Sequence, residues 1–130
     1  MSHIVKRYFD AFNAGDVPGM LACLSDDVTH HVNQGEVRTG KDAFAEFCAM
    51  MNQRYAETVS NLVIFEAPDQ SRAAAEYTVK GTYMMADPGQ PPAHGQPYTL
   101  SAGSFFDLKD GLITRVTTRF STADWLRQVS

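Results

Sequence analysis

The sequence predicts an α+β fold in which a strongly curved, mostly antiparallel sheet is wrapped by N-terminal helices around a pocket. Two observations support this prediction. The first half of the chain repeats apolar residues at helical spacing, and the second half alternates apolar and polar residues between turn signals. Helices followed by hairpin-connected strands are typical of α+β proteins. With 130 residues and no linker, residues 1–130 are expected to form a single domain.

Three helices are expected before the main strands. Ser2 caps the first, which ends near Gly15 in a conformation that favours glycine. Asp16 caps a short second helix with Pro18 in its first turn. The buried side of this second helix carries Met20, Leu21 and Leu24. The third helix runs from residue 40 to about residue 55.

The strands follow from period-two alternation. The turn at residues 25–27 leads into a strand that begins at Val28, and residues 59–65, 72–85, 98–108 and 112–120 form the later strands. Gly81 is expected to mark a bend or bulge. Residues 87–95 are rich in proline and form a stiff loop. Ser121 opens a short C-terminal helix that contains Trp125.

The composition excludes several classes of function. The net charge of −4 and the absence of a basic run argue against binding to nucleic acid or to an anionic membrane. No apolar stretch is long enough to span a membrane, and no signal peptide is recognisable. Cys23 and Cys48 are expected to be reduced, buried thiols in a cytoplasmic protein. No phosphate loop, dinucleotide fingerprint or metal-ligand spacing occurs, so no cofactor and no metal are implied.

The segment from Val28 to Gly40 places four uncharged polar side chains within five residues. These side chains are His30, His31, Asn33 and Gln34. Burying such groups without hydrogen bond partners is costly, so they are either solvated or directed into a cavity. We expect that these side chains are directed into a cavity.

In several segments the chain resembles the ketosteroid isomerase-related group of the NTF2-like (SnoaL-like) superfamily. The matching segments, in order, are Arg7-Tyr8, Asn13-Ala14-Gly15-Asp16, Asp26-Asp27-Val28-Thr29, Val32-Asn33-Gln34-Gly35, Arg38-Thr39-Gly40, Asp110-Gly111, the strand from Ile113 to Phe120 and Trp125. The resemblance covers nearly the whole chain. It implies a cone-shaped fold around a pocket, a small hydrophobic carbonyl ligand and a homodimer formed through the sheet.

The resemblance also implies roles for individual residues. In ketosteroid isomerase a carboxylate moves the proton, while a tyrosine and a protonated aspartate stabilise the oxyanion. Tyr8 matches the oxyanion tyrosine. The position of the base falls at His31 when the chain is aligned backwards from Gly40, or at Val32 when it is aligned forwards from Asp27. The oxyanion aspartate falls near residues 102–103, where no carboxyl group exists.

His30, His31 and Tyr8 are the catalytic candidates. Adjacent residues of a strand point to opposite faces, so one histidine is expected to face the cavity, where it can act as a general base or acid. The alternative is a hydrogen-bonded or surface histidine. Tyr8 lies on the apolar face of its helix, so it is either a core tyrosine or an oxyanion donor.

Six further residues are candidates for substrate binding: Asn33, Gln34, Tyr83, Phe105, Arg115 and Thr118. The amides of Asn33 and Gln34 either hold an enolate oxygen or form a turn. Tyr83 and Phe105 belong either to an aromatic cavity wall or to a plain core. Arg115 shares a strand face with residues 117 and 119. An outward orientation is favoured for this face, because Thr118 and its neighbours of the same parity then form the pocket wall.

Two main functional hypotheses remain. The first is an isomerase or polyketide cyclase that moves a proton alpha to a carbonyl of a small hydrophobic substrate. The alternative is a non-catalytic ligand-binding or dimeric association module, because one fold hosts many functions. A third hypothesis, a hydrolase or dehydratase, needs a carboxylate–arginine pair, which only Asp107 with Arg115 offers.

Overall fold

The computed structural model describes residues 3–130, so the expected cap Ser2 lies outside the described residues. The helices are α1 (His3–Asn13), α2 (Val17–Ala22), α3 (Lys41–Arg54) and α4 (Thr122–Val129). The strands are β1 (Leu24–Val32), β2 (Arg38–Thr39), β3 (Tyr55–Glu66), β4 (Arg72–Tyr83), β5 (Gln96–Lys109) and β6 (Leu112–Phe120). None of the helices in the described range is long and apolar enough to cross a membrane.

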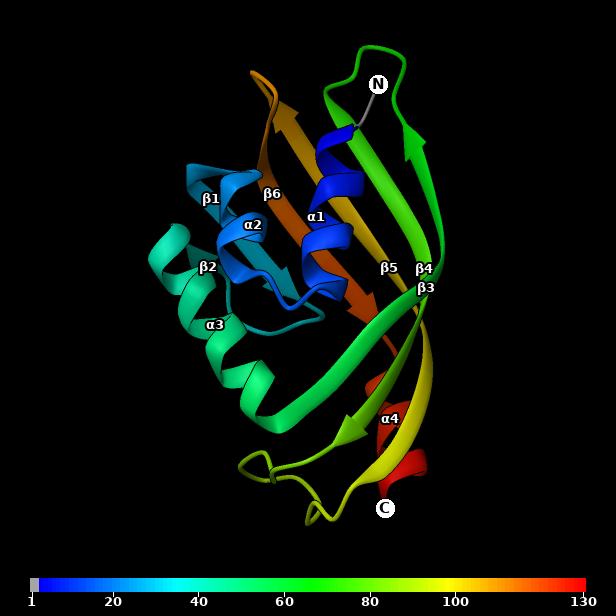
Figure 1. The fold of residues 1–130 in the computed structure, drawn as a ribbon. Coiled ribbons are helices and arrows are strands. Elements are labelled where there is room, and N and C mark those ends of the chain that lie inside the picture. The colour runs from blue at the N-terminus through cyan, green and yellow to red at the C-terminus, as the bar shows by residue number, and fades with distance from the viewer. Residues whose placement is uncertain (1–2) are drawn as a thin grey trace.

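The strands form one sheet in the order β2-β1-β6-β5-β4-β3. Only β1 and β6 run parallel, and the other neighbours are antiparallel. Figure 1 shows that the long strands twist strongly and that α1, α2 and α3 lie against one face of the sheet. The α+β prediction of a curved, mostly antiparallel sheet wrapped by helices is confirmed.

Helix α4 lies beside β5, at the end of the molecule that holds the C-terminus (Figure 1). The side chain of Gln128 accepts from the backbone N–H of Thr99 and donates to its carbonyl, both at 2.8 Å. Gln96 on β5 donates to the carbonyl of Val129 at 2.8 Å. These bonds fix α4 on the sheet, so its buried Trp125 is held over the interior.

Two of the expected helix caps, Asp16 and Ser121, are present. The carboxylate of Asp16 accepts from the backbone N–H of Gly19 at 2.9 Å, and the hydroxyl of Ser121 accepts from that of Asp124 at 3.1 Å. Both side chains satisfy N–H groups that the first turn of a helix leaves without partners.

Three boundary predictions need correction. Strand β3 begins at Tyr55, directly after α3, instead of at Val59, because residues 55–58 pair with the end of β4. Strand β1 begins at Leu24, so this buried leucine belongs to a strand and not to α2, and residues 25–27 lie inside β1. The ranges predicted for the other strands agree with the structure to within a few residues at their ends.

The structure has no bulge at Gly81, so that part of the prediction is wrong. The register of β4 with β5 is continuous from end to end, and that with β3 is continuous through Gly81. The irregularity lies in β3 instead, between Ser60 and Val63, where Asn61 has a φ of 55°. Gly81 has a different role, because a Cβ atom built on it would lie 2.2 Å from Cζ of Tyr98.

Two clusters of aromatic rings fill the interior. In the first, Tyr8 contacts Phe9, Phe106 and Phe44, with ring centroids 5.3, 5.8 and 6.3 Å apart. The second cluster joins α4 to the ends of the long strands and consists of Tyr55, Tyr83, Tyr98 and Trp125. Edge-to-face contacts of this kind stabilise beyond the area they bury.

Candidate active site

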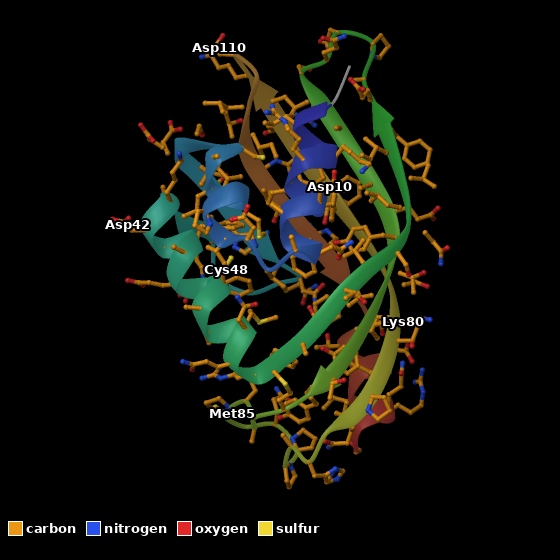
Figure 2. All side chains as sticks on the ribbon, in the orientation of Figure 1. Asp10, Asp42, Cys48, Lys80, Met85 and Asp110 are labelled. Atoms are coloured by element: carbon orange, nitrogen blue, oxygen red, sulfur yellow. The ribbon has the colours of Figure 1, made fainter. Side chains whose placement is uncertain are left out.

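A cavity of about 760 Å³ lies between the helices and the inner face of the sheet. It is lined by residues of α1, α3, α4 and all of the long strands. The lining is largely apolar with a small number of polar groups, as is typical of sites for small organic ligands. Figure 2 shows the two sides of α3: Asp42 points away from the molecule, while Cys48, which lines the cavity, lies toward the interior.

His30 is the cavity histidine. On β1 it is in register with Val116 of β6 and Arg38 of β2, and its side chain is only 4% exposed. The rings of Phe44 and Phe47 on α3 lie on it, each with a centroid distance of 4.7 Å. Its Nδ1 has no hydrogen bond partner within residues 3–130. A buried imidazole nitrogen without a partner is rare in native structures and calls for an explanation such as a functional role.

The electrostatic surroundings keep His30 neutral. Burial, the largest cause, and the nearby charges of Arg38 and His31 together lower the pKa of its imidazole from 6.5 to about 4. The guanidinium of Arg38 stands 4.5 Å from the ring centre of Phe47. At neutral pH the imidazole therefore carries no charge and can accept a proton.

Tyr8 lines the same cavity from α1 and is 7% exposed. Burial, the largest cause, raises the pKa of its phenol well above 10. The group therefore remains protonated over the physiological pH range and can act as a hydrogen bond donor.

A chain of three hydroxyl groups crosses the sheet side of the cavity. The hydroxyls of Tyr77 and Ser104 lie 2.7 Å apart, and those of Ser104 and Thr118 lie 3.1 Å apart. The residues come from β4, β5 and β6, and all three line the cavity. Each hydroxyl can donate or accept a hydrogen bond. The direction of these hydrogen bonds can therefore reverse to suit a bound donor or acceptor.

The loop between β4 and β5 contributes to the other end of the cavity. Asp87 of this loop lines the cavity, forms an ion pair with Arg54 and accepts from the hydroxyl of Tyr55 at 2.6 Å. The hydroxyl of Tyr83 accepts from the backbone N–H of Asp87 at 3.0 Å and donates to the carbonyl of Pro91 at 2.7 Å. These bonds attach the loop to the end of α3 and the start of β3.

The structure brings three of the predicted site residues together around the cavity: Tyr8, His30 and Thr118. It also resolves the choice between the histidines. His31 points to the opposite face of β1, as strand alternation requires, and is not part of the lining.

Asn33 and Gln34 lie outside the cavity lining. Asn33 adopts a left-handed φ of 51°, and its side-chain oxygen accepts from the backbone N–H of Phe120 at 2.9 Å. Gln34 is exposed. This is the turn that the sequence left open as the alternative to an oxyanion site.

Tyr83, Phe105 and Arg115 also lie outside the lining. Tyr83 is fully buried in the second aromatic cluster. Phe105 is 45% exposed on the outer face, because alternation along β5 places its neighbour Phe106 inside. Arg115 takes the favoured outward orientation and pairs with Asp107 across the hairpin at 3.0 Å.

Sequence reasoning missed three carboxyl groups of the cavity, Glu36, Glu57 and Asp87. Glu57 lies on β3 in a segment that was assigned to the end of the third helix and the link after it. The parity of that strand was the available signal, since Glu57 lies two residues before the buried Val59 and therefore shares its face. Asp87 could not be found by periodicity because it lies in a loop.

No group of three or more His, Cys, Asp or Glu residues in the described range could hold a metal ion. The two cysteines are free and buried, as expected. Burial raises the pKa of the Cys48 thiol to about 11, so this cavity residue is not a reactive thiolate at neutral pH.

Comparison with known proteins identifies the family. The model of the SnoaL-like domain matches residues 5–116. A solved protein from a Silicibacter species, provisionally described as a polyketide cyclase, shares 62% identity with a TM-score of 0.97, and the match covers 98% of this chain and 93% of that one.

Two further structures carry the same provisional description. The Pseudomonas putida protein is 49% identical, with a TM-score of 0.95 and coverage of 98% of this chain and 96% of that one. The Xanthomonas campestris protein is 44% identical, with a TM-score of 0.96 and coverage of 98% and 95%. The fold is thus the NTF2-like cone that the resemblance implied, and the chain belongs to the SnoaL-like domain family.

Proposed function

We propose that this protein is a cofactor-independent cyclase or isomerase that moves a proton alpha to a carbonyl of a small hydrophobic substrate. One observation carries the proposal: His30 is a buried, neutral imidazole that lines a large apolar cavity and has a nitrogen without a partner in the described chain. The provisional descriptions of the three relatives as polyketide cyclases support the same reaction class.

In the proposed step, the imidazole of His30 removes the proton alpha to the carbonyl. The C–H bond breaks, an N–H bond forms, and the electron pair moves onto the carbonyl oxygen as an enolate. The O–H group of Tyr8 donates to that oxygen. A cyclase then uses the enolate carbon to attack a second carbonyl, whose oxygen takes up the proton held by His30. An isomerase instead returns that proton to another carbon. Neither outcome requires an oxidant or a metal.

The low pKa of His30 is compatible with this role when the charge of the substrate is considered together with that of the imidazole. Protonation of the free site would place a lone cation between two aromatic rings and beside Arg38. Transfer from the substrate creates an imidazolium and an enolate together, so the cavity as a whole gains no net charge. A water-excluded site strengthens the attraction between the two charges.

A second candidate function is a non-catalytic receptor for a small ligand. The observation that favours it is also the pKa of about 4, because a base this weak removes carbon-bound protons slowly unless the enolate is well stabilised. A receptor would use the same apolar lining without proton transfer.

Binding of an enolate mimic separates the two functions. A planar phenol that is ionised at neutral pH is titrated against wild type, Tyr8→Phe, His30→Gln and His31→Gln, with thermal stabilisation as the readout. We expect Tyr8→Phe to weaken binding about tenfold or more, because a hydrogen bond to the charged oxygen is lost. His30→Gln should weaken binding by a similar factor, because an amide cannot take up the proton that would pair with the bound phenolate. His31→Gln is the matched control and should bind as wild type does. Equal binding by all four proteins would support the receptor.

A further inference from the structure

Glu57 is a cavity carboxyl group that the proton-transfer step does not use. It lies on β3 and lines the cavity. No lysine or arginine of the described chain forms an ion pair with it. Its recorded partner is the hydroxyl of Tyr98, which donates to Oε2 at 2.5 Å. A carboxylate withdrawn from water with one phenol as its partner retains unused acceptor capacity.

Three strands hold this pair in place. Glu57 of β3, Gly81 of β4 and Tyr98 of β5 are consecutive partners in the sheet register. The Tyr98 ring lies over Gly81, because a Cβ atom there would come within 2.2 Å of Cζ and 2.4 Å of the hydroxyl oxygen. Only glycine lets the phenol cross the middle strand and reach Glu57. The position of the carboxyl group is therefore fixed by the backbone as well as by a hydrogen bond.

Hydrogen bonding fixes the orientation of the carboxyl group. Tyr98 occupies Oε2, and no hydrogen bond from residues 3–130 reaches Oε1. Burial, the largest cause, raises the pKa of Glu57, while the bond from Tyr98 lowers it. The ionised form therefore depends on hydrogen bond donors, and a donor on the ligand would add a second one.

We infer that Glu57, oriented by Tyr98 across Gly81, is a subsite that accepts a hydrogen bond from a phenolic or enolic hydroxyl of the ligand. This inference rests on the proposed function and narrows its substrate class. The substrate carries a carbonyl for His30 and Tyr8 and, at a separate position, a free hydroxyl for Glu57. Hydroxylated aromatic polyketides have this chemistry, whereas hydrocarbons with a single carbonyl lack it.

A naphthalenediol and its monomethyl ether test the subsite. Calorimetric titration gives the ratio of their two dissociation constants for each protein. We expect wild type to bind the diol about tenfold or more tightly than the ether, as a hydrogen bond to a charged acceptor implies. Glu57→Gln should abolish most of this ratio, because an amide N–H can donate to a hydroxyl and to an ether oxygen alike.

Tyr98→Phe provides a second variant that keeps the carboxyl group but removes its positioning partner. It should reduce the ratio while leaving affinity for the ether unchanged. Glu76→Gln is the matched control, since Glu76 is an exposed carboxylate on β4. A ratio near one in wild type, or a ratio unchanged in Glu57→Gln, would overturn the inference. Either result can occur while His30→Gln still weakens binding of the ionised phenol, so failure here is distinct from failure of the proposed function.

Discussion

The imidazole of His30 on β1 and the ring of Phe44 on α3 lie with their centroids 4.7 Å apart. This contact withdraws the histidine from water and is part of the burial that lowers its pKa to about 4. A neutral base in the cavity is thus a consequence of how α3 packs on the sheet.

The first prediction concerns stability against pH. The pKa of His30 is lowered from 6.5 to about 4, so between these values the unfolded chain binds a proton that the folded chain does not. The contribution of His30 to the free energy of unfolding therefore falls as pH decreases through about 6.5, and the loss is complete below about 4. At about pH 4.5 the loss is on the order of 2–3 kcal/mol.

Urea unfolding at about pH 7.5 and about pH 4.5 measures this loss. The decrease should be smaller in His30→Gln than in wild type by roughly that amount. His31→Gln should keep the wild-type decrease because His30 remains. The same decrease in all three proteins would show that His30 does not titrate abnormally.

The second prediction concerns the glycine between Glu57 and Tyr98. Gly81→Ala should destabilise the protein by about 1–3 kcal/mol, because the new methyl group overlaps the Tyr98 ring. In a Tyr98→Leu background the same substitution should cost much less, since a shorter side chain leaves the space free. Denaturant unfolding of the four proteins in this double-mutant cycle gives the coupling energy, and a coupling near zero would contradict the contact.

The third prediction concerns the turn after β1. Asn33→Ala removes the acceptor for the Phe120 N–H and places alanine at a φ of 51°. We expect a loss of about 1–3 kcal/mol in the free energy of unfolding. Asn33→Asp keeps an acceptor in place and should lose less. Ligand affinity should be unchanged in both variants. A loss of affinity without a matching loss of stability would instead indicate that Asn33 takes part in ligand binding.

The fourth prediction concerns the loop of residues 84–95. Asp87→Asn removes the charge that pairs with Arg54. Amide hydrogen exchange in this loop should become faster, whereas exchange in β4 and β5 should not change. Asp69→Asn, in the turn between β3 and β4, is the control and should leave the loop unaffected. Unchanged exchange in Asp87→Asn would show that the other hydrogen bonds to the loop, such as those of Tyr83 and Gln96, are enough to hold it.

Much of the fold could be predicted because its signals are local. Period-two alternation located β4, and the side chains of Asp16 and Ser121 marked two helix starts. Gly81 shows where local reasoning fails. An isolated glycine in a strand suggests a bulge, and only the register of three strands shows that it makes room for a ring from β5.

The site was less predictable, because three of the nine candidate residues line the cavity and six do not. Strand alternation required one histidine to face inward, but alternation alone does not say which face of the strand lies against the cavity. The resemblance pointed to residues 31 or 32, and the structure places His30 in the cavity. Glu57 was missed because its segment resembles the end of a helix in composition, and its role depends on pairing with β4.

Exchange of alpha protons for deuterium tests the central claim most directly. Beta-tetralone, a ketone with acidic alpha protons, is incubated in heavy water with wild type, His30→Gln or His31→Gln, and proton NMR follows the loss of the alpha signals. The account predicts exchange faster than in buffer for wild type and His31→Gln, and a decrease of about 100-fold or more in His30→Gln. Exchange no faster than in buffer, or equal in wild type and His30→Gln, would contradict the assignment of His30 as the base.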